Sequence, residues 1–299
     1  MNVTIRKSNA WREALYGYTF IAPMMLGYII FLLGPILMAF MMSFTNWSLF
    51  ESASYVGLAN YRQAIMGEEL FWSTVKNTLY FSAGLVPLNI MISLSLALLL
   101  QKKVKGIGLF RTIVFTPVVT SLVAWGIVWK YIFNTDGGLV NQLLHLFGMT
   151  GPAWLYDFQL AMPVVILVSV LKNVGMNMVI FLAALQDVPV MYYEAAKIDG
   201  ASPWKRFVHV TLPLIAPSLF LTMVITTIGS LKVFGQIYVM TGGGPGDSTK
   251  VLVYYIYEQA FKLYQFGYAS AVAFLLFGII LLLTVLQWVV RKRWIYHEQ

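Results

Sequence analysis

Six long apolar runs, separated by shorter polar segments, organise the sequence. They cover residues 17–43, 77–100, 112–133, 160–185, 212–238 and 268–290. A helix of about 20 residues crosses the hydrocarbon core of a bilayer, and each run reaches that length. The runs lack the alternation of a barrel strand, and in lipid a helix satisfies its own backbone polar groups. The pattern therefore predicts an all-α membrane protein with six transmembrane helices in one domain over residues 1–299.

The composition agrees with a lipid environment. Hydrophobic residues make up 59% of the 299 residues and charged residues 11%, and the mean hydropathy is +0.75. This is more apolar surface than a soluble domain of that size buries in one core. The first run is too long for a secretory signal, whose apolar region has about 7–15 residues. The absence of cysteine excludes disulfides and thiol catalysis.

Basic residues gather beside alternate ends of the runs. One side carries Arg6, Lys7, Arg12, Lys102, Lys103, Lys105, Arg111, Lys197, Lys205, Arg206, Arg291, Lys292 and Arg293. The other side carries only Arg62, Lys76, Lys130, Lys250 and Lys262. Because loops rich in Lys and Arg stay in the cytoplasm, both termini are expected to be cytoplasmic. Orientation and contact with lipid headgroups account for the net charge of +8, so nucleic acid is not an expected partner.

The cytoplasmic loop between the fourth and fifth runs, residues 186–211, has more local pattern than a connection needs. Helix-starting residues before "VMYYEAAKI" and Gly200 after it delimit a first short helix. Ser202 and Pro203 form an N-cap and first-turn pair for a second short helix, "PWKRFVHV". The loop is therefore predicted to hold two short cytoplasmic helices joined by a glycine elbow.

The segment "EAAKIDGASPWKRFVHVTLPLIAP" resembles the EAA signature of ATP-binding-cassette (ABC) importer permeases. The matching loop residues are Glu194, Ala195, Ala196, Asp199, Gly200 and Ala201. In that family the segment forms a coupling helix that docks in a cleft of a separate ATPase subunit. The resemblance implies the same role for these residues, and the small side chains near the elbow would let a partner approach closely.

The resemblance extends through nearly the whole chain to carbohydrate-uptake permeases of the maltose, multiple-sugar and glycerol-3-phosphate type. It is carried by "VGLANYRQAI", "WKYIFNTDGGLVNQLLHLFG" and "VFGQIYVMTGGGPGDSTKVLVYYIYEQAF". It implies a bacterial inner-membrane subunit that moves a sugar or polyol inward by alternating access. The implied partners are a second, homologous permease subunit, two ATPase subunits, an extracytoplasmic solute-binding protein and membrane lipid. ATP and magnesium would belong to the ATPases, so this chain is expected to be no enzyme and to bind no cofactor.

Polar residues in the fourth and fifth runs mark a candidate substrate path, consistent with the use that the resembling family makes of these spans. The candidates are Lys172, Asn173, Asn177, Lys232, Gln236 and Tyr238. Asn173 and Asn177, and likewise Lys232 and Gln236, are four residues apart and are predicted to share a helix face. A charge near mid-bilayer costs roughly 2.5–3.5 kcal/mol, so such residues usually face a bundle interior or water. The alternatives are that the lysines snorkel to the outer interface or that the asparagines bond a neighbouring helix.

Other motifs carry no chemistry. "GGGPGDSTK", residues 242–250, has the wrong residue order for a P-loop and is predicted to form a tight outer turn. The three histidines are scattered, so no metal site is predicted. "LVNQLLHLF", residues 139–147, predicts a short amphipathic helix on the outer surface. A self-contained secondary carrier or a membrane-embedded enzyme is the alternative function. The sugar, and whether the partner permease is homologous or identical, stay open.

Overall fold

The computed structural model describes residues 7–50, 52–101 and 105–291, and these form helices and connecting loops without a strand. The α-helices are α1 (Lys7–Tyr28), α2 (Gly34–Met42), α3 (Ala59–Arg62), α4 (Glu69–Leu100), α5 (Ile107–Val119), α6 (Leu122–Ile132), α7 (Leu139–Leu146), α8 (Ala161–Gln186), α9 (Val190–Ile198), α10 (Pro203–Arg206), α11 (Leu212–Leu231), α12 (Gly235–Met240), α13 (Leu252–Tyr257) and α14 (Phe266–Arg291). The short π-helical turns are η1 (Ile29–Leu33), η2 (Gln63–Gly67), η3 (Phe207–Thr211) and η4 (Glu258–Lys262).

Five helical segments in the described residues are long and apolar enough to cross a membrane. They are Trp11–Met42, Glu69–Leu100, Ala161–Gln186, Pro203–Leu231 and Phe266–Arg291. The helical prediction for the first, second, fourth and sixth apolar runs is confirmed. The short outer helix predicted over 139–147 is present as α7.

The third apolar run is not the continuous helix that was expected. It forms the pair α5 and α6, which meet at an angle of 101° and make a sixth span only if the pair is counted as one. Thr120 and Ser121, between them, have extended ψ angles of 148° and 135°. Pro117 lies one turn before the break and has no N–H for the helix ladder. The break leaves carbonyl groups at the end of α5 that need donors from elsewhere.

Two expectations about the fifth run are also wrong. The helix ends at Leu231, seven residues early, and α12 starts only at Gly235, so Lys232 and Gln236 do not share a helix face. The second short helix of the cytoplasmic loop is not separate either. It begins at Pro203 as predicted but continues through η3 into α11, giving one segment of 29 residues.

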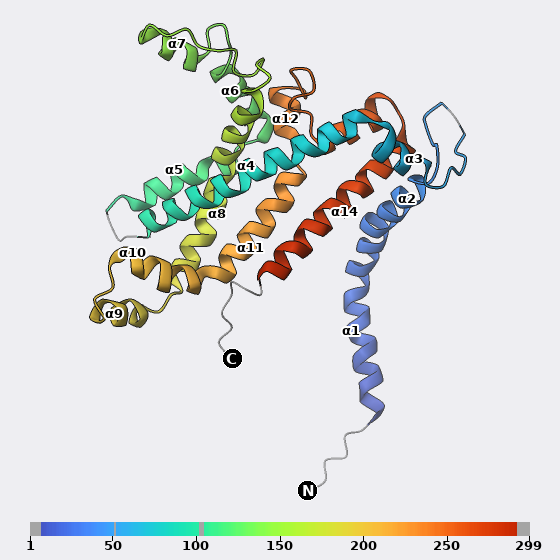
Figure 1. The fold of residues 1–299 in the computed structure, drawn as a ribbon. Helices are drawn as coiled ribbons and strands as arrows, with labels where there is room; N and C mark the ends of the chain where they lie inside the picture. Colours follow the sequence, from blue (N-terminus) through green and yellow to red (C-terminus); the bar gives the residue numbers. More distant parts are fainter. Residues whose placement is uncertain (1–6, 51, 102–104, 292–299) are drawn as a thin grey trace.

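Helix α8 lies at the centre of the bundle, and α4, α5 and α11 pack against it. In its most apolar window 67% of the residues are buried, against 33% for α4 and 0% for the first span. Close packing of α8 on α5 requires Gly175, because a Cβ there would clash with the backbone oxygen of Val114. The α1 part of the first span extends away from the other helices (Figure 1), whereas α2 packs against α14, with Phe40 on Phe274.

The loops gather at two ends of the bundle. Figure 1 shows α9 and α10, the start of α1 and the end of α14 toward one end, and α3, α7 and α12 toward the other. Of the basic residues used to predict orientation, Arg6, Lys102, Lys103, Lys292 and Arg293 lie outside the described residues. The described ones at the first end include Lys197, Lys205 and Arg206 on α9 and α10.

Candidate functional site

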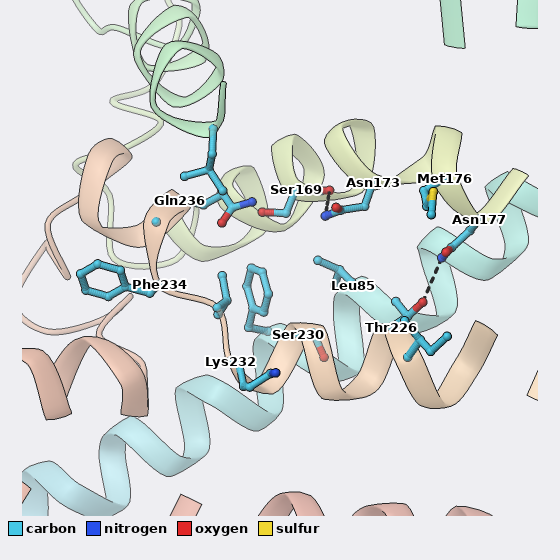
Figure 2. A pocket seen from close by; sticks show the side chains of 16 residues that line it. Leu85, Ser169, Asn173, Met176, Asn177, Thr226, Ser230, Lys232, Phe234 and Gln236 are labelled. Carbon is cyan, nitrogen blue, oxygen red and sulfur yellow. Dashed lines mark hydrogen bonds between the residues drawn. The ribbon is translucent and has the colours of Figure 1, made fainter. Parts of the chain in front are cut away.

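A cavity of about 420 Å³ lies among α4, α8 and α11, where α11 ends and α12 begins. Its polar lining consists of hydroxyl and amide groups and one ammonium, from Ser169, Asn173, Asn177, Thr226, Ser230, Lys232 and Gln236. Phe81, Phe234 and aliphatic side chains supply the rest. Figure 2 shows the α8 residues along one side and the end of α11 with Lys232 on the other. A volume within about 300–1,000 Å³ and a few convergent polar groups are typical of small-molecule sites.

Four of the six candidate path residues line this cavity: Asn173, Asn177, Lys232 and Gln236. Lys172 and Tyr238 do not. Sequence reasoning missed the hydroxyl residues Ser169, Thr226 and Ser230. Their signal was present, because Ser169 is four residues before Asn173 and Thr226 is four residues before Ser230, so each pair follows one helix face.

Asn177 both lines the cavity and joins three helices. Its Nδ2 donates to Oδ1 of Asn89 on α4 at 2.6 Å and to Oγ1 of Thr226 on α11 at 2.9 Å. Asn89 is fully buried, and the Ser93 hydroxyl donates to its Oδ1 at 3.2 Å. Of the two interpretations of Asn177, lining a path and bonding a neighbouring helix, the geometry supports both. Asn89 and Ser93 were missed, although their four-residue spacing in an apolar run was a signal.

The side-chain amides of Asn173 and Gln236 make fewer hydrogen bonds to other helices than that of Asn177 does. Asn173 Nδ2 donates to the Ser169 carbonyl of its own helix at 2.8 Å. Gln236, in the first turn of α12, is 7% exposed and faces the cavity near Ser169 (Figure 2). These two amides are therefore the groups best placed to bond a solute without first breaking a contact between helices.

Lys172 braces the bent helix pair instead of lining the cavity. It is 7% exposed, and its Nζ donates to the carbonyl oxygens of Pro117 at 2.6 Å and Thr120 at 2.8 Å. The Pro117 carbonyl also accepts from the Thr120 hydroxyl at 2.6 Å and the Thr120 backbone N–H at 3.3 Å, whereas the Thr120 carbonyl lies at the break and depends on Lys172. An ammonium at the C-terminal end of a helix is also favoured by the helix dipole. Trp125 of α6 donates through Nε1 to the Val168 carbonyl at 3.1 Å, which fixes α6 against α8.

Tyr238 belongs to an aromatic cluster beside the cavity. Its ring centroid is 5.4 Å from that of Phe234 and 5.6 Å from that of Tyr257. Phe234 lines the cavity, and Tyr238 is 48% exposed, so the cluster connects the cavity wall to the surface of the chain. Lys262 lies 5.2 Å above the ring of Tyr254, which also packs in the cluster.

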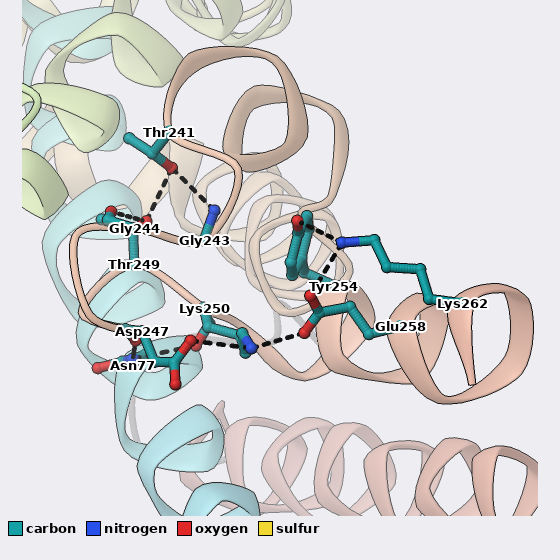
Figure 3. A network of polar contacts seen from close by, with 10 residues as sticks. All are labelled: Asn77, Thr241, Gly243, Gly244, Asp247, Thr249, Lys250, Tyr254, Glu258 and Lys262. Atoms are coloured by element: carbon teal, nitrogen blue, oxygen red, sulfur yellow. Dashed lines mark hydrogen bonds and ion pairs between the residues drawn. The ribbon is translucent and has the colours of Figure 1, made fainter. Parts of the chain in front are cut away.

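The glycine-rich loop after α12 is held by a network of polar contacts (Figure 3). Asn77 of α4 donates to the backbone oxygens of Asp247 and Lys250, both at 3.0 Å. Lys250 Nζ lies 2.8 Å from Asp247 Oδ1 and 2.6 Å from Glu258 Oε2. Gly243 has a φ of +87°, a conformation that glycine adopts without strain. Since two carboxylates hold the lysine, the loop is a braced turn and no phosphate cradle.

Lys250 keeps its positive charge at physiological pH. Burial lowers the pKa of Lys250, but hydrogen bonds and charge from Asp247 and Glu258 raise it more, so the net pKa lies above its ordinary value of 10.5. A raised pKa means that the stabilisation is fully present below 10.5 and is lost only as the pH rises further.

The segment with the EAA signature forms an exposed helix and turn. Helix α9 ends at Ile198, and Gly200 follows with a φ of +73°. The backbone N–H of Ala201 returns to the Ala196 carbonyl at 2.9 Å, which closes the end of the helix. Ser202 accepts a hydrogen bond from the Lys205 backbone N–H at 3.3 Å, as an N-cap does.

The exposed surface of this segment combines large apolar side chains with acidic ones. Met191 is 67% exposed, Ile198 86% and Trp204 71%, and Glu194 and Asp199 are also exposed. Tyr193 and Thr211 share a hydrogen bond of 3.0 Å between their hydroxyls, which ties α9 to η3 at the base of α11. This contact links α9 to α11, the helix that carries Thr226 and Ser230 and that ends beside the cavity.

Comparison with known proteins places the chain among membrane transport components. Residues 89–296 match the family described as binding-protein-dependent transport system inner membrane component. The chain is 34% identical over 299 residues to the probable ABC transporter permease protein YesP of Bacillus subtilis (strain 168), covering 99% of this chain and 94% of YesP. It is 36% identical over 294 residues to the lactose transport system permease protein LacF of Rhizobium radiobacter, covering 96% and 97%.

A solved structure shares the fold. It is that of a bacterial ABC transporter involved in the import of the acidic polysaccharide alginate, with a TM-score of 0.84. The match covers 96% of this chain and 98% of that chain. The sequence identity is 23%, so the likeness concerns the arrangement of the helices alone.

Proposed function

This chain belongs to the family of binding-protein-dependent transport system inner membrane components, and we propose that the solute it helps to import is a sugar or related polyol. It is a permease subunit of an ATP-driven ABC importer, with the ATPase on separate subunits. The observation that carries the substrate proposal is the cavity where α11 breaks, with its hydroxyl and amide lining beside Phe234. Such groups match sugar hydroxyls, and an aromatic ring matches the apolar face of a sugar ring. The name of LacF, a lactose permease, supports the same class of solute.

We further propose that α9 is the coupling helix. Glu194, Ala195, Ala196, Asp199, Gly200 and Ala201 would form the surface that an ATPase subunit contacts. The exposed apolar side chains of Met191 and Ile198 support this, because apolar surface exposed to water is unfavourable and is typical of a protein-binding surface. The contact from Tyr193 to Thr211 supplies a mechanical link from the docked helix to α11.

The proposed assembly contains a second, homologous permease subunit, two ATPase subunits and an extracytoplasmic solute-binding protein, within the bacterial inner membrane. Both termini and α9 would face the cytoplasm, and α7 and the glycine-rich loop would face outward. The arrangement of the helix ends in Figure 1 supports this orientation. This chain itself would hold no cofactor, with ATP and magnesium on the ATPases.

The test uses the complete transporter with its ATPases and binding protein in proteoliposomes. The double variant Asn173→Leu/Gln236→Leu removes two amides that line the cavity without bonding another helix. Each lost hydrogen bond costs about 0.5–1.5 kcal/mol, so ATP-dependent sugar uptake at low concentration should fall roughly tenfold. Recovery of the assembled complex should not change.

The matched control is Gln142→Leu, on α7, whose amide bonds the nearby Gly137 carbonyl at 2.9 Å and does not line the cavity. It should leave uptake as in the wild type. If the double variant also imports its sugar at the wild-type rate, the cavity is not the solute site. Uptake without ATP would instead revive a self-contained carrier.

A further inference from the structure

Lys232 is the one charged residue among the described residues that line the cavity. No aspartate or glutamate lines it within that part of the chain. The ion pairs between described residues all lie in the outer network of Asp247, Lys250, Glu258 and Lys262. Lys232 thus brings a positive charge to the cavity without a carboxylate from the described chain to balance it.

The position of Lys232 at a helix end favours its positive charge, but no carboxylate of the described residues pairs with it. Lys232 is the C-cap residue of α11, where the helix dipole favours a cation. Its side chain is exposed, in contrast to Lys172, which is 7% exposed and bonded to backbone carbonyls. Lys172 therefore bonds backbone groups of the protein itself, whereas Lys232 presents its charge to the cavity.

We propose that the imported sugar carries an anionic group, a carboxylate or a phosphate, and that Lys232 pairs with it during passage. This inference rests on the proposed function and specifies its substrate class. Neighbouring groups suit the rest of such a molecule, with the amides of Asn173 and Gln236 for hydroxyls and the Phe234 ring for a sugar face.

Two other roles for Lys232 give different results. If it only caps α11, its loss destabilises the helix end and affects every substrate equally. If it pairs with an acid of the second permease subunit, its loss weakens assembly, again without regard to substrate charge. A preference that depends on substrate charge therefore separates the proposal from both.

The experiment offers matched sugars to the complete transporter in proteoliposomes and identifies the imported species by mass spectrometry. The probes are galactobiose with digalacturonate, trehalose with trehalose 6-phosphate, and partial hydrolysates of starch and of pectin. The first pair tests a carboxylate and the second a phosphate. We expect the wild type to import anionic members in preference to neutral ones. In Lys232→Met the ratio of anionic to neutral uptake should fall roughly tenfold, the size of one charge-assisted hydrogen bond.

Two further variants sharpen the result. Lys232→Arg keeps the charge and should keep most of the preference, whereas Gln236→Glu adds an acid to the cavity and should lower it. Lys130→Met removes an exposed positive charge on α6 that does not line the cavity, and should leave the ratio unchanged. A wild type that imports only neutral sugars, or an unchanged ratio in Lys232→Met, overturns the anionic class while sugar import stands. Import of no sugar at all overturns the proposed function as well.

Discussion

At the scale of single residues, neighbouring polar side chains have different tasks. Lys172 and Asn173 are adjacent in α8, yet one bonds the end of α5 and the other faces the cavity. The reason is rotation, because successive residues of a helix point about 100° apart. Lys232 differs again, since it stands after the last turn of α11.

We expect Lys172→Met to destabilise the protein more than it alters selectivity. The substitution leaves the Thr120 carbonyl without its side-chain donor, at about 1–3 kcal/mol for an unsatisfied buried group, and removes one of three donors to the Pro117 carbonyl. The melting temperature of the purified complex should therefore fall, and Lys172→Arg should restore part of it. Lys130→Met is the control that removes an exposed lysine. A wild-type melting temperature together with altered sugar preference would place Lys172 in the path instead.

At the scale of elements, the breaks in helices matter as much as the helices. The bend between α5 and α6, the gap between α11 and α12, and the Gly200 elbow each end a helix beside a functional group. The first two breaks leave backbone groups without helical hydrogen bonds inside the apolar spans. This is tolerated because protein surrounds those groups. The elbow lies outside the spans and sets the angle at which α9 leaves α11.

The elbow gives a prediction with a built-in control. Gly200→Val places a β-branched residue at a φ of +73°, at a cost of about 1–2 kcal/mol, while Gly200→Asn is tolerated there. A Cβ at this position meets no atom within 4 Å, so the backbone alone separates the two variants. Gly200→Val should weaken recovery of the ATPase with the permease roughly five- to thirtyfold and lower uptake. Equal recovery in both variants would contradict the coupling role.

Glu194→Arg tests the charge of the same surface, since Glu194 is exposed on α9. It should reduce ATPase binding without changing the amount of permease in the membrane. Co-purification measures the first and immunoblotting of membranes the second. Wild-type co-purification would remove Glu194 from the docking surface.

At the scale of the whole molecule, the topology can be labelled directly, because the chain contains no cysteine. Ile198 of α9 is 86% exposed and Leu146 of α7 is 81% exposed, so a single cysteine at either site is accessible. In right-side-out vesicles an impermeant maleimide should label Leu146→Cys and spare Ile198→Cys until the membrane is opened. The reverse pattern would invert the proposed orientation. Gly246 is a poorer site, because a Cβ there would lie 2.5 Å from Phe158 Cε1.

The sequence by itself determined the features that depend on neighbouring residues. The apolar runs predicted helices because length and hydropathy decide whether a segment enters lipid. Gly200, Ser202 and Pro203 predicted the turn after α9, since each favours one local backbone conformation. The resemblance carried by Glu194-Ala195-Ala196 and the segments around it also led to the transport family before any geometry.

Only the tertiary structure decided which polar groups meet. Asn177 reaches Asn89 and Thr226 across separations of 88 and 49 residues, and no local pattern specifies such partners. The bend after α5 is held by Lys172 of α8, and α11 ends at Leu231 although apolar residues continue beyond it. Hydropathy along the chain therefore reveals neither break. Tyr238 and Lys172 were expected in the path because they lie in the right spans. Helix rotation and the break positions, which follow from packing, direct them to the aromatic cluster and the end of α5.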